Sequence, residues 1–192
     1  MGEERKRIVV VTGPTAAGKT SLAVDLALAL DGEVVNADSM QVYRGMDVGT
    51  AKPTEEEKRG VPHHLLDVVD PDQPFNAARY RELAAPAIEG VTGSGRACFV
   101  VGGTGLYIRA LLGGLFECPE ASPAVRARLN REWEEKGGGA LHERLRSRDP
   151  EAAGRVHPND RVRVLRALEV IELTGRPFSA LAGDHRFREG TF

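Results

Sequence analysis

The stretch that decides the fold is Gly13-Pro14-Thr15-Ala16-Ala17-Gly18-Lys19-Thr20, which matches the pattern G-x-x-x-x-G-K-[ST] in full. A β-branched run, residues 7–12, precedes this stretch, and an apolar helical pattern, residues 19–30, follows it. Glycines allow the backbone to turn successive N–H groups toward an anion, and the following helix points its positive end at the same place. Lys19 adds a mobile cation, and Thr20 adds a hydroxyl suited to Mg²⁺. The pattern predicts a P-loop that binds a diphosphate or a triphosphate, and it does not decide between the two.

Short β-branched runs alternate with helical patterns through the first part of the chain. Strands are predicted at residues 7–12, 33–36, 64–69 and 97–101, and helices at 19–30, 54–57, 76–91 and from 106 onward. Thr54 opens a capping box, and Asn76 is placed to cap the helix that follows it. This rhythm is typical of a parallel sheet with helices on both faces. We therefore expect an α/β fold of the P-loop kind.

The rhythm changes near residue 117, and no strand pattern interrupts residues 122–174. Helices are predicted at residues 122–136, 140–147 and 158–174, and residues 187–192 read as a loop. Ser122 is a candidate cap for the first of these helices, with Pro123 at its first position. The sequence thus predicts an α/β core over residues 1–116 and a mostly helical segment over residues 117–192.

Composition excludes several classes of protein. The chain has 192 residues, 41% of them apolar and 28% charged, as in ordinary globular proteins. Its apolar runs are too short to span a bilayer, and no signal-peptide pattern follows the charged residues 1–7. Cys98 and Cys118 lack metal-ligand spacing, so we expect two reduced thiols. These features favour a cytoplasmic protein that does not associate with membranes.

Charge is distributed unevenly along the chain, although the net charge is only −2. Residues 121–192 carry 14 Lys and Arg side chains against 11 Asp and Glu, and 13 of the 14 cations are Arg. A basic face suits a phosphate-backbone partner. Charge alone favours the simpler interpretation, a solvated helical surface with internal Glu–Arg pairs.

Asp38 is the acidic residue that follows a predicted strand. The carboxyl ends of parallel strands meet at one edge of a sheet, so Asp38 is expected beside the P-loop. A carboxylate there can be a metal ligand or a general base, and the alternative is an Asp that only forms a turn. The strand at residues 97–101 runs into Gly-Gly-Thr-Gly and lacks the acidic residue that holds Mg²⁺ in many nucleotide hydrolases.

Five stretches together resemble one known family. They are GPTAAGKT (13–20), ADSMQVYRGMDVGTAKP (37–53), GVPHHLLDVVDP (60–71), VGGTGLYIRALLGG (101–114) and HPNDRVRVLRALEV (157–170). In this order they are similar to the tRNA dimethylallyltransferases, a family of tRNA prenyltransferases. The resemblance implies a P-loop fold with a helical insert that binds tRNA. It also implies transfer of a dimethylallyl group from dimethylallyl diphosphate to N6 of the adenosine just 3′ of the anticodon.

The resemblance also implies a role for each matching residue. The P-loop would hold the diphosphate, with Lys19 and a Mg²⁺ ion on Thr20 stabilising the departing pyrophosphate. Asp38 would take a proton from the adenine amino group, which must leave its stack to react. The residues implied to contact tRNA are Asp38, Ser39, Met40, Gln41, Thr104, Arg126, Asp160, Arg161, Val162 and Arg163.

Alternatives and minor expectations remain beside this hypothesis. A small-molecule or nucleoside kinase could use the same P-loop, with ATP as its occupant and Asp38 activating a hydroxyl. An RNA-binding module without turnover is a third possibility. Family members are longer, and their chain returns to the core where this sequence reaches Phe192, so we expect a shortened core. We further expect a monomer, a structural role for His63 and His64, and packing for Trp133.

Overall fold

The computed structural model describes residues 7–115 and 118–185, which form two compact units, residues 7–114 and residues 115–185. The boundary predicted between residues 116 and 117, and the loop predicted at residues 187–192, lie outside the described residues. Each unit has its own core, so the two are described separately.

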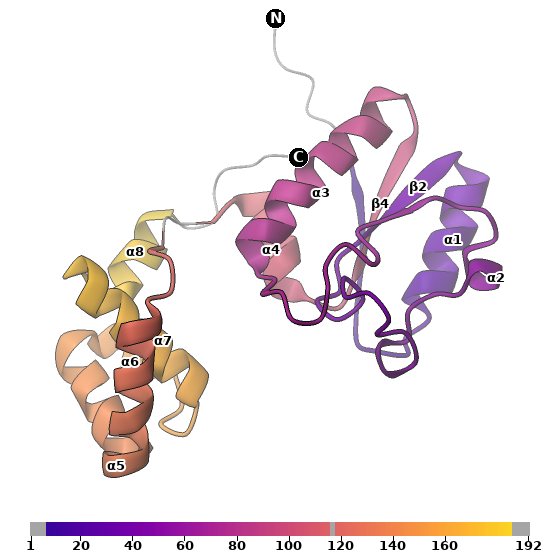
Figure 1. Ribbon diagram of the computed structural model, residues 1–192. Helices are drawn as coiled ribbons and strands as arrows, with labels where there is room; N and C mark the ends of the chain where they lie inside the picture. Colours follow the sequence, from indigo (N-terminus) through magenta and orange to yellow (C-terminus); the bar gives the residue numbers. More distant parts are fainter. Residues whose placement is uncertain (1–6, 116–117, 186–192) are drawn as a thin grey trace, which may run out of the picture. The chain divides into compact units, whose positions relative to one another are not determined.

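The first unit is built on a four-stranded parallel sheet with the strand order β1-β4-β2-β3 (Figure 1). Its strands are β1 (Val9–Thr12), β2 (Gly32–Asn36), β3 (His63–His64) and β4 (Ala97–Gly102). The prediction of a parallel α/β sheet is confirmed. The third strand is much shorter than the predicted 64–69, because Leu65 and Asp67 adopt positive φ angles of 63° and 55° that break an extended backbone.

Helices cover both faces of this sheet (Figure 1). They are α1 (Lys19–Ala29), α2 (Glu55–Lys58), α3 (Ala77–Gly93) and α4 (Gly105–Gly113), with a 3₁₀ turn η1 at Val48–Thr50. The core between α1 and the sheet consists of Ala23, Val24, Ala27, Val34, Val61, Phe99 and Val101. Both caps predicted in this unit are present: Thr54 and Glu57 form a capping box on α2, and Asn76 accepts a hydrogen bond from the Arg79 N–H on α3.

The second unit is helical. It contains α5 (Pro123–Arg148), α6 (Pro150–Arg155), α7 (Arg161–Thr174) and α8 (Phe178–His185). The two helices predicted at 122–136 and 140–147 are confirmed as the two parts of α5, which are separated at Gly137, where a φ of 79° and a ψ of 163° are not helical. Helix α7 begins later than the predicted residue 158, because Asp160 caps it. Sequence analysis missed α6 and α8.

One buried side chain explains why α6 and α8 form. Asp149 caps α6 through the Ala152 N–H, at 3.0 Å, and accepts hydrogen bonds from both the N–H and the hydroxyl of Ser179 in α8. Burial opposes the charge on Asp149, but these hydrogen bonds hold its pKa below the ordinary value. The core of the unit is formed by Leu129, Leu141, Leu145, Ala152, Ala153, Val164, Leu165, Ala167, Leu168 and Ile171.

Both cysteines are free, as predicted. Trp133 packs against the core of the second unit, also as predicted. No helix within residues 7–115 and 118–185 combines the length and the apolar character needed to cross a membrane.

Candidate functional site

The P-loop connects β1 to the start of α1 and leaves its donors available. Gly18 adopts the left-handed conformation at the N-cap of α1, with a φ of 73°, and no side chain caps this end of the helix. The first turn of α1 also carries no acidic residue. The N–H groups and the positive end of the helix dipole are therefore open to an anion.

Lys19 reaches back over the loop. Its Nζ donates to the carbonyl oxygen of Pro14 at 2.6 Å. This contact keeps the ammonium beside the loop, so a phosphate bound there would find a cation within reach.

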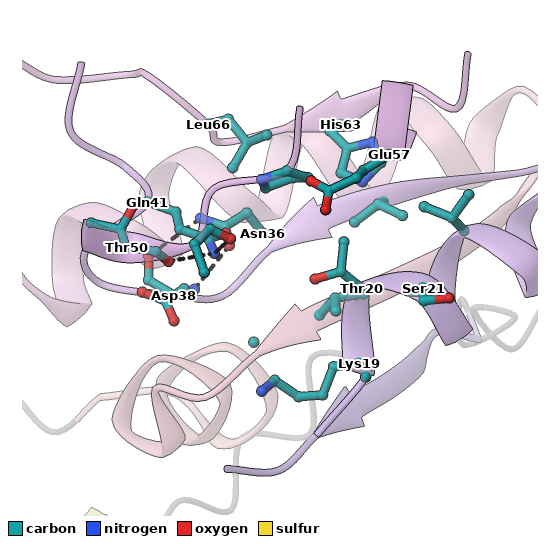
Figure 2. Close-up of a pocket in the computed structure, with 18 of the residues that line it drawn as sticks. Lys19, Thr20, Ser21, Asn36, Asp38, Gln41, Thr50, Glu57, His63 and Leu66 are labelled. Carbon is teal, nitrogen blue, oxygen red and sulfur yellow. Dashed lines mark hydrogen bonds between the residues drawn. The ribbon is translucent and has the colours of Figure 1, made fainter. Parts of the chain in front are cut away.

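A cavity of about 550 Å³ joins the P-loop to Asp38. Figure 2 shows Lys19 and Thr20 at one part of its wall, and Asp38 and Gln41 at another. The lining also includes the apolar side chains of Ala23, Val24, Val34, Leu66 and Val101. The volume lies in the range of small-ligand sites. A ligand with an anionic part and an apolar part fits a lining of this composition.

Asp38 lies in a turn directly after β2. Its Oδ1 accepts the Met40 N–H at 2.9 Å, so one carboxylate oxygen belongs to the turn itself. No other hydrogen bond to the Asp38 carboxylate is found among the residues that the structure describes. The second oxygen can therefore serve a ligand in the cavity.

The turn is held by two neighbours that sequence analysis treated differently. Asn36 is 3% exposed and bonds to both the N–H and the C=O of Asp38. Thr104 accepts the Ser39 N–H at 2.9 Å. Thr104 was expected as a tRNA contact, whereas Asn36 was missed. The signal that could have found it is an Asn at the buried end of a strand, two residues before the acid.

The loop after Asp38 is held by its own contacts. The side-chain amide of Gln41 donates to the carbonyl oxygens of Thr50 and Ala51, at 3.1 and 3.0 Å. Met40, in contrast, is 45% exposed. Gln41 thus reaches the cavity as part of a rigid rim, and Met40 presents an apolar surface to solvent.

Lys52 fastens the same rim. Its Nζ donates to the carboxylates of Asp47 and Asp67, each at 2.6 Å, and to the Tyr43 carbonyl oxygen at 2.7 Å. Burial opposes the charge of Lys52, but the two carboxylates hold its pKa above the ordinary value. The loop from Tyr43 to Asp67 is therefore closed by one buried cation.

The two histidines have structural partners. His63 Nδ1 lies 2.8 Å from the Val61 carbonyl oxygen, and burial lowers the pKa of His63. His64 Nε2 lies 2.6 Å from Glu33, and this contact, together with Arg96, holds the pKa of Glu33 below the ordinary value. Within the described ranges, no three His, Cys, Asp or Glu side chains gather closely enough to hold a metal ion.

In the second unit, the residues implied to contact tRNA are mostly engaged in contacts of their own. Arg126 donates to the buried carboxylate of Glu169 at 2.8 Å. Arg161 donates to Asn130 and Glu134, and its guanidinium lies 6.0 Å from the ring centre of Trp133.

The start of α7 is more open. Asp160 caps the helix through the Arg163 N–H. Val162 is 79% exposed, and the Arg163 side chain is 73% exposed. Exposed side chains at this end of α7 can reach a partner without breaking the core.

A parallel sheet with a P-loop and a carboxylate on one cavity defines the class of P-loop α/β proteins. The family model described as IPP transferase matches residues 41–191, and the model described as isopentenyl transferase matches residues 6–73. The chain belongs to the IPP transferase family.

Curated relatives agree with this assignment. The chain is 54% identical over 187 residues to the tRNA dimethylallyltransferase of Geobacter metallireducens, covering 97% of this chain and 60% of the relative. It is 56% identical over 186 residues to the tRNA dimethylallyltransferase of Anaeromyxobacter dehalogenans, covering 97% and 61%. The chain thus spans about 60% of the length of these relatives.

Solved structures match as well. The full-length tRNA isopentenylpyrophosphate transferase of Bacillus halodurans is 48% identical, with a TM-score of 0.57 over 90% of this chain and 57% of that chain. A eukaryotic dimethylallyltransferase acting on tRNA is 31% identical, with a TM-score of 0.78 over 95% and 46%. These matches give the kinase alternative no support.

Proposed function

We propose that this protein transfers a dimethylallyl group from dimethylallyl diphosphate to N6 of the adenosine 3′ of the anticodon in tRNA. The observation that carries the proposal is the single cavity lined by the P-loop, an apolar wall and Asp38. The family assignment and the names of the relatives support the same reaction.

The diphosphate end of the donor fits the P-loop. Backbone N–H groups and the start of α1 face it, and Lys19 contributes a positive charge close to the leaving group. Thr20 offers a hard oxygen on the same cavity. This oxygen suits Mg²⁺, which usually keeps one or two protein ligands and completes its shell with phosphate oxygens and water. When bound, Mg²⁺ would neutralise charge on the diphosphate.

Asp38 is the proposed general base. The adenine amino nitrogen attacks C1 of the dimethylallyl group, and the bond from C1 to the diphosphate oxygen breaks. The carboxylate oxygen of Asp38 that the turn leaves available accepts the proton that the nitrogen gives up. Diphosphate leaves with the electron pair of the broken bond. The cavity also offers the apolar side chains of Val34, Leu66 and Val101 to the prenyl group.

The acceptor must bring its adenine out of the base stack to reach this cavity. We propose that Ser39, Met40, Gln41 and Thr104 meet the extruded nucleotide, since they surround Asp38 along the rim. We also propose that the segment 117–192 is the tRNA-binding insert, and that the start of α7, around Val162 and Arg163, is its exposed contact with tRNA. Its other proposed contacts are Arg126, Asp160 and Arg161. We further propose that the protein acts as a cytoplasmic monomer.

The test is intact-mass analysis of an anticodon stem-loop. The RNA is incubated with the protein, Mg²⁺ and dimethylallyl diphosphate, and a second tube receives ATP in place of the prenyl donor. A gain of one C5H8 unit is expected in the first tube only. A gain of phosphate in the ATP tube would favour a kinase instead.

Asp38→Asn provides the mechanistic control. Asn keeps an oxygen for the Met40 N–H, so the turn is retained while the base is lost. Transfer is expected to fall about 10²- to 10⁴-fold, the usual contribution of a general base. Asp72→Asn, at an exposed acid, is the matched variant that should retain the rate. A chimera is assayed in parallel, in which this chain is joined to the part of the Geobacter metallireducens relative that the match does not cover. Absence of prenyl transfer by both proteins would contradict the proposal.

A further inference from the structure

The turn that carries Asp38 is held by side chains rather than by the sheet. β2 ends at Asn36, so the strand ladder no longer supports Asp38. The Asp38 N–H donates to Asn36 Oδ1 at 3.1 Å, and the Asp38 carbonyl oxygen accepts from Asn36 Nδ2 at 3.2 Å. Both backbone groups of the proposed base thus depend on one neighbouring amide.

Asn36 also ties this turn to a second loop. Its Nδ2 donates to the Leu65 carbonyl oxygen at 3.1 Å, a contact that spans 29 positions in the sequence. Asn36 is 3% exposed, so it has little access to water that could replace these bonds. A buried amide costs stability unless its hydrogen bonds are made. We therefore expect all three hydrogen bonds of the Asn36 amide to persist in solution.

The next residue along is fixed from the other side. Thr104 Oγ1 accepts the Ser39 N–H at 2.9 Å, and the Thr104 N–H donates to the Ala37 carbonyl oxygen at 3.1 Å. Gly102 permits this approach, because a Cβ there would lie 2.2 Å from the Ala37 carbonyl carbon and oxygen.

The same segment, residues 102–104, lies beside the P-loop. A Cβ built on Gly103 would lie 3.5 Å from the Gly13 carbonyl oxygen, so Gly103 is a close neighbour of the loop. This short segment therefore holds the turn of the base and lies next to the loop expected to hold the diphosphate.

We infer that Asn36, together with Thr104, is a positioning residue that sets the direction of the Asp38 carboxylate relative to the P-loop. The inference rests on the proposed function, because the direction of Asp38 matters most if Asp38 accepts the proton. Neither side chain needs to contact the donor for this role. Their removal should therefore lower kcat and leave donor binding unchanged.

Four variants test the inference. Asn36→Ala removes the three bonds of the amide, and Thr104→Val removes the acceptor for the Ser39 N–H while keeping the volume. Thr104→Ser keeps the hydroxyl and should restore the rate. Asn76→Ala removes a helix cap remote from the cavity and is the control for a general loss of stability.

The first measurement is steady-state prenyl transfer with the stem-loop. Because a displacement of about 1 Å can cost about 10²-fold in rate, Asn36→Ala is expected to lower kcat by at least tenfold. KM for dimethylallyl diphosphate should change by less than about twofold. Asn76→Ala should retain kcat. The inference is wrong if Asn36→Ala keeps kcat within twofold, or if KM for the donor rises as much as kcat falls.

The second measurement does not require turnover. Amide hydrogen exchange in the ligand-free protein should speed up at Asp38 in Asn36→Ala, and at Ser39 in Thr104→Val. Unchanged exchange at both positions would overturn the inference even if transfer is observed. If neither the wild-type protein nor the chimera transfers a prenyl group, the proposed function fails, and the exchange result still decides whether these residues hold the turn. A Thr104→Val variant that raises KM for RNA at normal kcat would leave Thr104 with the proposed nucleotide contact alone and would refute its positioning role.

Discussion

Replacing Glu169 by Gln tests whether Arg126 serves the second unit or RNA. Glu169 lies in α7 and is 1% exposed. Its Oε1 accepts the Ser122 N–H at 2.9 Å, and its Oε2 accepts from Arg126 and Arg166, at 2.8 and 2.7 Å. Burial opposes this charge, but the hydrogen bonds from Arg166 and Arg126 hold the pKa of Glu169 below the ordinary value.

The expected loss of unfolding free energy in Glu169→Gln follows from these contacts. Gln has the same shape but offers one acceptor oxygen, so at least one N–H loses its partner whichever way the amide turns. A hydrogen bond to a charged group contributes about 1.5–3 kcal/mol, against about 0.5–1.5 kcal/mol for a neutral one. Two weakened guanidinium bonds would give about 2 kcal/mol, and the N–H that loses its partner adds about 1 kcal/mol. The Arg126 side chain is 49% exposed, so water replaces part of its bond, and we expect a loss of about 2–3 kcal/mol.

The assay is urea unfolding followed by tryptophan fluorescence. The chain has a single Trp, Trp133, and it packs against the core of the second unit, so its emission reports on that unit. Glu134→Gln is the matched control, because Glu134 is exposed and its pair with Arg161 should contribute little. If the urea midpoint of Glu169→Gln equals that of Glu134→Gln, the Glu169 contacts do not stabilise the second unit and the reasoning is refuted. Weaker RNA binding at unchanged stability would also refute it, because Arg126 would then act through RNA.

Three further predictions follow from the first and second units. Gly102→Ala should lower stability by about 1–3 kcal/mol and transfer by at least tenfold, because the added Cβ would overlap the Ala37 carbonyl; thermal unfolding and the stem-loop assay measure the two effects. Lys19→Ala should weaken binding of dimethylallyl diphosphate by about 10- to 100-fold, measured by calorimetry, because a charged hydrogen-bond donor is lost. The lowered pKa values of Glu169 and Asp149 stabilise the second unit above the ordinary carboxyl pKa, and this stability should be lost as pH falls through the lowered values. Urea midpoints measured between about pH 7 and pH 3 test that loss, and an unchanged midpoint would contradict it.

Local sequence pattern predicted the elements that local chemistry controls. The P-loop, the β-branched strands and the caps Thr54 and Asn76 depend on residues near them in sequence, and each is found. The strand order depends on pairing between distant segments, which periodicity does not report. The third strand was predicted too long because its apolar residues hide the positive φ angles of Leu65 and Asp67.

The candidate site divides in the same way. The position of Asp38 beside the P-loop follows from strand direction, so sequence was sufficient for it. The role of Asn36 depends on Leu65, which lies 29 residues away, so no short motif contains it. The start of helix α6 has a local signal, Asp149 as the cap followed by Pro150. The hydrogen bond by which Asp149 stabilises α8 joins distant residues, so only the three-dimensional structure shows it.

The Arg-rich segment agrees with the simpler interpretation of its charge, a helical surface with internal Glu–Arg pairs. Arg128 and Arg144 both pair with Glu132 within α5 and with Glu172 in α7. Such pairs serve the helical unit, and their charge is largely cancelled at the distance of an RNA phosphate. At the start of α7, Arg161 pairs with Glu134 and Arg163 pairs with Asp160, but the Arg163 side chain is 73% exposed. This exposure, rather than the number of Arg residues, is the feature relevant to RNA binding.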